Sequence, residues 1–163
     1  AQETMFEPTH MRAAIALSRS FERDRGYTPF GAVVVLNGEV EGEGISAVVR
    51  DVDPTAHAEI LAIRHACTKV GSHLLPGAAL YSSGYPCPLC LMACYWAQVT
   101  EVYYAAELVD SQRVGFEDRD FYRELTLPPH ERSIRVAPVG EPLRAEAAQV
   151  LREWHATLDD SSG

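Results

Sequence analysis

The sequence is nearly without lysine. Among its 163 residues Lys69 is the only one, so arginine carries almost all of the positive charge. The 14 basic residues are outnumbered by 23 acidic ones, which gives a formal net charge of −9. Such a chain has little long-range attraction for phosphate backbones or anionic membranes, although this does not exclude a local basic patch. Nucleic acid is therefore not favoured as a partner.

Long apolar runs and a secretory leader are missing as well. No stretch approaches the roughly 20 apolar residues that a membrane-spanning helix needs. The first ten residues, AQETMFEPTH, lack a positively charged segment followed by an apolar one, so we expect no secretory signal and a cytoplasmic protein. With 47% hydrophobic and 23% charged residues, a chain of this length is expected to form one domain over residues 1–163.

Cysteine is scarce, and its spacing is informative. The chain has four cysteines, which is an unpromising basis for a disulfide framework in a protein of this size. Three of them, Cys87, Cys90 and Cys94, lie within eight residues of one another. This clustering favours a metal site or a reactive thiol.

Hydrophobic periodicity and turn residues predict helices and strands in alternation. We expect a helix over residues 9–25, then two strands within 31–49 joined by a turn at Asn37-Gly38, then a helix that begins after Asp53-Pro54-Thr55 and is closed by Gly71. Further on we expect a strand over 78–83, a helix over 88–99, a strand over 101–108, short helical segments within 111–132, a strand over 133–139 and a helix over 143–158. This alternation predicts a three-layer α/β/α sandwich around one sheet.

Two short stretches, AHAEI (56–60) and PCPLC (86–90), carry residues that bind metals. Cys87 and Cys90 are spaced so that both sulfurs point to one side of a helix N-terminus, where the free amides and the helix dipole favour thiolates. His57, at the start of the other helix, supplies a third ligand. Three protein ligands and one open position are typical of catalytic zinc. Glu59, at the first turn, is placed to pass a proton to a leaving amine.

The combination of H-x-E with P-C-x-x-C is the pattern of the zinc-dependent nucleobase and nucleoside deaminases. Four longer stretches extend the match: PFGAVVV (29–35), DPTAHAEILAIRHAC (53–67), PCPLCLMACYWAQVTEVYYAAEL (86–108) and GFEDRDFYREL (115–125). On these residues the chain resembles the cytidine deaminase superfamily, and within it the guanine deaminase branch. The resemblance implies a five-stranded mixed sheet flanked by helices, a homodimer, a zinc cofactor and hydrolytic deamination of a small free base, with guanine as the first expectation.

The same resemblance implies roles for single residues. Glu59 is the expected proton shuttle, and Asp118 a second acid near the leaving group. Substrate-binding positions are expected at Phe30, Ser46, Ala58, Tyr85 and Trp96. Tyr85 stands where the branch usually has glutamate, and Ser46 where it usually has asparagine, so their hydrogen-bonding capacities differ from the pattern. Other bases (isoguanine, cytosine, aminotriazines) or a nucleoside therefore stay open as substrates.

Other functions account for fewer of these residues. A redox role for CPLC leaves His57 and Glu59 unused. A structural zinc site needs a fourth ligand, for which Cys94 is the candidate, but we expect Cys94 and Cys67 to pack in the core. An RNA-editing adenosine deaminase must hold a polyanion, to which a net charge of −9 is poorly suited. A non-catalytic, zinc-stabilised dimerisation module has no need of Glu59.

Overall fold

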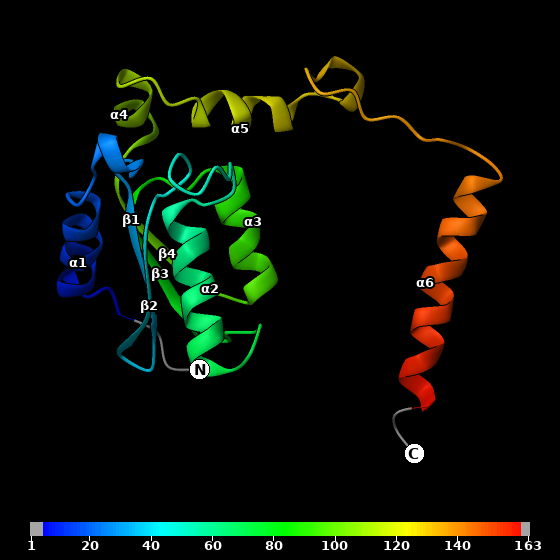
Figure 1. Cartoon of the computed structure of the whole chain (residues 1–163), viewed down its shortest axis with the longest axis horizontal. Coiled ribbons are helices and arrows are strands. Elements are labelled where there is room, and N and C mark those ends of the chain that lie inside the picture. Colours follow the sequence, from blue (N-terminus) through cyan, green and yellow to red (C-terminus); the bar gives the residue numbers. More distant parts are fainter. Residues whose placement is uncertain (1–4, 161–163) are drawn as a thin grey trace. The chain divides into compact units, whose positions relative to one another are not determined.

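The computed structural model describes residues 5–160, with side chains as far as residue 158. The chain divides after Arg123 into two units, which are described separately. The first unit is built on a sheet of β1 (Gly31–Leu36), β2 (Glu39–Ile45), β3 (Ala79–Gly84) and β4 (Glu101–Ala106), in the order β2-β1-β3-β4 (Figure 1). β1 runs antiparallel to both β2 and β3, whereas β3 and β4 are parallel. The expected mixed sheet is thus present.

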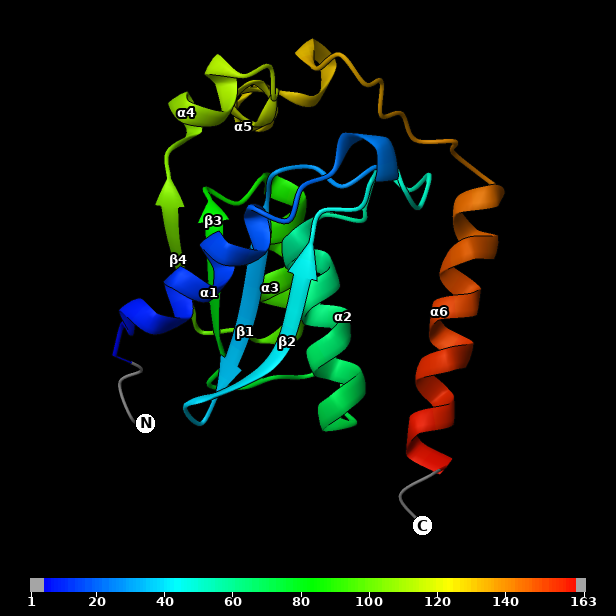
Figure 2. The ribbon, with the colours of Figure 1, turned by 60° about the vertical axis from the view of Figure 1, so that its left-hand side comes forward.

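Helices cover both faces of this sheet, as the alternation predicts. α1 (Pro8–Ser18) packs on one face, and α2 (Ala58–Val70) and α3 (Pro88–Ala97) lie on the other (Figure 2). Met11 and Ala14 of α1 pack with Val33 and Tyr81, while the opposite core contains residues of α2, α3 and the sheet. The three-layer α/β/α arrangement is confirmed.

The expected number of strands is wrong, because the described residues form a sheet of four rather than five. Residues 133–139 form no strand. The segment offers only Ile134 and Val136 as alternating apolar positions before Pro138, which has no amide hydrogen to donate to a ladder. The first helix is also shorter than expected: α1 ends at Ser18, and Arg23–Arg25 form a separate 3-10 turn.

Local turn signals are confirmed residue by residue. Asn37 and Gly38 both have positive φ, 53° and 78°, as a tight two-residue hairpin turn requires. Gly71, at φ 78°, ends α2 with its amide donating to Cys67 O. Lys69, in the last turn of α2, forms an ion pair with Glu41 of β2 at 3.1 Å.

Two glycines of β2 allow α2 to lie very close to the sheet. A Cβ on Gly44 would lie 2.1 Å from Ala58 O, and a Cβ on Gly42 would lie 2.1 Å from Ala62 O. Since both atoms belong to the main chain of α2, the helix rests on the bare backbone of β2. This contact fixes the first turn of α2 and therefore the place of His57, its N-cap residue.

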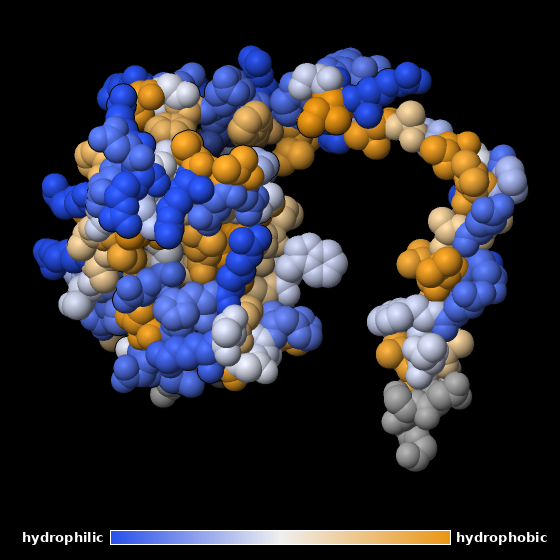
Figure 3. All heavy atoms as spheres, viewed as in Figure 1, coloured by the Kyte–Doolittle hydropathy of each residue, from blue (hydrophilic) through white to orange (hydrophobic). Residues whose placement is uncertain are grey.

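The remaining helices are α4 (Leu108–Arg113), α5 (Asp118–Thr126), which crosses the division between the units, the 3-10 turn η2 (Pro129–Glu131) and α6 (Leu143–Asp160). In the second unit Arg132 Nε donates to Glu124 O and Leu127 O, which satisfies carbonyls at the end of α5. Hydrophilic side chains predominate on the face of the first unit drawn in Figure 3, and apolar residues recur along α6. Within residues 5–160, none of the helices has both the length and the apolarity to cross a bilayer.

Candidate active site

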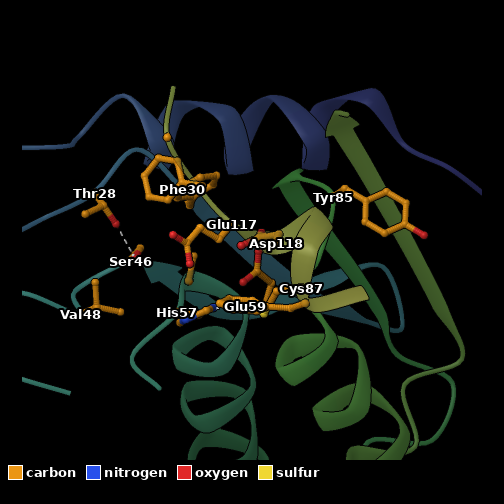
Figure 4. A pocket seen from close by; sticks show the side chains of 14 residues that line it. Thr28, Phe30, Ser46, Val48, His57, Glu59, Tyr85, Cys87, Glu117 and Asp118 are labelled. Carbon is orange, nitrogen blue, oxygen red and sulfur yellow. Dashed lines mark hydrogen bonds between the residues drawn. The ribbon is translucent and has the colours of Figure 1, made fainter. Parts of the chain in front are cut away.

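The N-termini of α2 and α3 lie side by side and bring together the three predicted metal ligands (Figure 4). His57 is the N-cap of α2 and Cys87 the N-cap of α3, and Pro88 opens α3 at a position where a missing amide costs nothing. His57 Nδ1 lies 3.4 Å from each of the two sulfurs, and Cys87 Sγ lies 3.6 Å from Cys90 Sγ. The prediction that these residues converge is confirmed.

These distances fit zinc. With Zn–S bonds of about 2.3 Å and a Zn–N bond of about 2.0–2.1 Å, tetrahedral geometry separates two sulfurs by about 3.8 Å and a sulfur from a nitrogen by about 3.6 Å. The observed 3.6 and 3.4 Å are within 0.2 Å of these values. Two thiolates and a neutral imidazole also balance the charge of a divalent zinc ion. Three protein ligands would leave a fourth coordination position for water, as is typical of catalytic zinc.

The electrostatics of the cluster already favour a thiolate. The contacts of Cys87 with Cys90 and with His57 lower the pKa of Cys87 to about 4. The same Cys87 contact raises the pKa of His57. The hydrogen bond between Cys90 and Cys87, together with burial, raises the pKa of Cys90. Cys87 is therefore the first of the two cysteines to lose its proton. Cys94 is a buried core thiol, and burial raises its pKa to about 12.

Glu59 lies in the first turn of α2 and is only 6% exposed. Its Oε2 lies 3.0 Å from the sulfur of Cys90, one of the three predicted metal ligands. Its Oε1 accepts a hydrogen bond of 2.6 Å from Ser82 Oγ of β3. A buried carboxylate held in this way can take up and release a proton next to a metal ion.

A cavity of about 310 Å³ opens over His57 and Glu59, near the lower end of the range for small-ligand sites. Besides His57, Glu59 and Cys87, five of the predicted residues line it: Phe30, Ser46, Ala58, Tyr85 and Asp118. Trp96 does not. It is 84% exposed and lines a separate hollow with Met92 and Tyr95, because nine residues of α3 place it about 13 Å along the helix axis from Cys87.

The cavity has further walls that sequence reasoning missed. Thr28 lines it and donates from Oγ1 to Ser46 Oγ at 2.6 Å. The Phe116 ring packs edge-on against Phe30, with 4.8 Å between centroids. Glu117, next to the predicted Asp118, also faces the cavity (Figure 4). Within the matched stretch 115–125 the resemblance implied a role for Asp118 alone, and nothing in the sequence singles out Thr28.

Contacts of tyrosine side chains attach α5 to Tyr85 and Pro86, which directly precede Cys87. Tyr122 Oη donates to Pro86 O at 2.5 Å, and the Tyr85 ring packs against Tyr104 and Tyr122. The Tyr85 ring therefore points away from the metal ligands (Figure 4). Asp118 is four residues before Tyr122, on the same side of α5, so this attachment also holds Asp118 at the cavity. Burial raises the pKa of Asp118.

Comparisons with known proteins agree with this site. Residues 6–106 match the family described as the cytidine and deoxycytidylate deaminase zinc-binding region. Guanine deaminase of Bacillus subtilis (strain 168) is 48% identical over 106 residues, 65% of this chain and 68% of that protein. The crystal structure of Bacillus subtilis guanine deaminase superimposes with a TM-score of 0.84 at 39% identity, over 91% of this chain and 95% of that one. A structure from a study of A-to-I editing by tRNA:A34 deaminases superimposes with a TM-score of 0.57 at 40% identity, over 61% of this chain and 76% of that one.

Proposed function

Because this chain belongs to the cytidine and deoxycytidylate deaminase zinc-binding family, we propose that it is a zinc-dependent guanine deaminase. The reaction exchanges the exocyclic amine of the base for oxygen from water and releases ammonia. The observation that carries the proposal is the convergence of His57, Cys87 and Cys90 beside Glu59, at the floor of a cavity of base-sized dimensions. The likeness to a guanine deaminase structure extends over 91% of the chain, against 61% for the tRNA deaminase structure.

The side chains divide the chemistry among them. His57, Cys87 and Cys90 would hold the zinc ion, which would supply a polarised, acidic water. Glu59 moves protons: its Oε2, on the side of the ligands, accepts a proton and returns it to the departing amine. Asp118, at the cavity rim, is placed to accept a hydrogen bond from that amine. Its raised pKa, caused by burial, leaves it a weaker acid than an exposed aspartate.

Recognition of the base uses residues on the other walls. The Phe30 and Phe116 rings form an apolar wall against which a flat heterocycle can stack. Since Thr28 donates its proton to Ser46, the Ser46 hydroxyl keeps its own proton to donate to the base. We assign to this pair of hydroxyls the recognition that the branch usually assigns to asparagine. The Glu117 and Asp118 carboxylates offer acceptors for the N–H groups of guanine.

The same likeness supports the remaining properties. We propose one deaminase domain over residues 1–163, because the superposition with guanine deaminase includes 91% of the chain. We propose a homodimer, for which the exposed Met92, Tyr95 and Trp96 of α3 provide an apolar surface to cover. A cytoplasmic location agrees with four free cysteines, and a small-molecule substrate rather than nucleic acid agrees with a net charge of −9.

Ammonia release from the zinc-loaded protein tests the function. The panel is guanine, isoguanine, cytosine, adenine, ammeline, guanosine and cytidine, with an anticodon stem-loop RNA as an eighth substrate. We expect guanine to give the highest kcat/KM. A preference for another base would refute guanine as the substrate and retain the deaminase chemistry, whereas no release from any member would refute the enzyme function.

A further inference from the structure

Ser82 lies behind the site, in the middle of β3, and is fully buried. Its hydroxyl oxygen is 2.6 Å from Glu59 Oε1 and 2.7 Å from Gly84 O. We propose that Ser82 is a positioning residue, whose hydroxyl holds Oε1 of Glu59 so that Oε2 is the oxygen that faces the metal ligands. This inference rests on the proposed deaminase function, in which Glu59 moves the proton.

The need for Ser82 follows from what metal binding does to the other partner of Glu59. In the described part of the chain, the other side chain that donates to this carboxylate is the Cys90 thiol, 3.0 Å from Oε2. A cysteine binds zinc as the thiolate, which has no proton to donate. The Cys90 hydrogen bond is therefore lost in the metal-loaded protein, and the Ser82 hydrogen bond remains.

The chemistry of the hydroxyl favours Glu59 as its acceptor. Ser82 has one proton for two acceptors, and an ionised carboxylate is a stronger acceptor than the neutral carbonyl of Gly84. Glutamate otherwise has three rotatable side-chain bonds, so a hydrogen bond to one oxygen fixes where the second oxygen points. Because Ser82 is on β3 and Glu59 on α2, the contact also ties the first turn of α2 to the sheet.

Ser83 offers a matched control on the same strand. Successive residues of a strand point to opposite faces, and Ser83 Oγ accepts a hydrogen bond of 3.0 Å from the Gly31 amide rather than contacting Glu59. Ser83 is also buried, at 9% exposure. Ser83→Ala therefore removes a buried hydroxyl and one hydrogen bond from β3 without touching the carboxylate.

The experiment compares Ser82→Ala, Ser82→Thr and Ser83→Ala with the wild type, using the base that the wild type deaminates best. We expect Ser82→Ala to lower kcat by about 10- to 100-fold with a change in KM below about threefold, because the proton-transfer group is misplaced rather than the base. Zinc content per chain should be unchanged. Ser82→Thr, which keeps the hydroxyl, and Ser83→Ala should both stay within about threefold of wild-type kcat, although Ser83→Ala lowers Tm as Ser82→Ala does.

The inference is overturned if Ser82→Ala keeps wild-type kcat, or if Ser82→Ala and Ser83→Ala lower kcat equally. A crystal structure of the zinc-loaded wild type gives a readout that needs no turnover: a distance from Ser82 Oγ to Oε1 beyond about 3.5 Å would refute the contact. If the wild type deaminates none of the bases, the proposed function fails, and this distance still decides the role of Ser82. If Ser82→Ala does not fold, Ser82→Cys replaces it, since a thiol is a weak donor of similar size.

Discussion

Replacing Gly44 with alanine is expected to lower activity by displacing the first turn of α2, although Gly44 itself does not line the cavity. A Cβ at this position would lie 2.1 Å from Ala58 O and 2.8 Å from Ala62 N, both main-chain atoms that cannot rotate away. Carbon–oxygen contacts of this kind lie at about 3.3 Å or more, so the first turn of α2 must move by about 1 Å. Ala58 stands between His57 and Glu59, and both move with it.

The size of the effect follows from this displacement. Overpacking of a close contact typically costs about 1–3 kcal/mol of unfolding free energy. For a chain of this length that corresponds to a Tm lower by about 2–12 °C. A shift of about 1 Å in a catalytic constellation costs on the order of 100-fold in turnover. We therefore expect Gly44→Ala to be folded at 25 °C, with kcat/KM about 100-fold below the wild type.

Gly42→Ala is the matched control, because it makes the same 2.1 Å contact with Ala62 O, one helical turn further from the site. It should lower Tm to a similar extent but lose less than about tenfold in kcat/KM. The assays are thermal unfolding, ammonia release and zinc titration on all three proteins. Equal losses of activity in the two variants, or a Gly44→Ala variant with wild-type Tm and turnover, would refute the reasoning.

Four further predictions concern the site itself. Glu59→Gln should keep its zinc by metal analysis and lose about 10²- to 10⁴-fold in kcat, and full activity would contradict its role as proton carrier. At a free zinc concentration 100 times the Kd, bound zinc adds about 2.7 kcal/mol to the free energy of unfolding. Chelation under reducing conditions should therefore lower Tm by about 5–11 °C, and an unchanged Tm would contradict the site. In the zinc-free protein, burial raises the pKa of Asp118, so ionising it destabilises the fold as pH rises through that raised value. Asp118→Asn should therefore melt above the wild type at pH 7, and the gap should shrink as pH falls toward 3.8; a gap independent of pH would exclude this cause. Thr28→Val should raise KM for the base by about 2- to 10-fold with little change in kcat, and a purely kcat effect would remove the Thr28–Ser46 pair from recognition.

The parts of the molecule that sequence predicts well are set by interactions between near neighbours. Asn37-Gly38 and Gly71 need positive φ, and both positions were predicted as the turn and the helix end that the structure shows. The convergence of the three predicted ligands was also predictable, because the Cys87–Cys90 spacing puts two sulfurs on one helix turn and His57 caps the preceding helix, α2. Residues 133–139 had a weaker signal, two alternating apolar residues, and form no strand.

The parts that sequence could not predict are contacts between distant segments. Ser82 contacts Glu59, Thr28 contacts Ser46, and Phe30 contacts Phe116. The partners are far apart in the sequence, and no repeating pattern of residues links them. Trp96 is the opposite case, a residue expected at the cavity that does not line it. The family resemblance implied a pocket wall there, but Trp96 lies near the far end of α3 and lines a different hollow.

The lone lysine has a practical consequence. Lys69 is 54% exposed and lies at the end of α2 opposite to His57, about 18 Å along the helix axis. As the single side-chain amine in these 163 residues, it is the one amine that a succinimidyl ester would modify once the α-amino group is blocked. A biotin or a sensor surface coupled there would hold each molecule by the end of α2 that is remote from the cavity. Immobilised protein would then present its cavity to the flowing sample in one orientation.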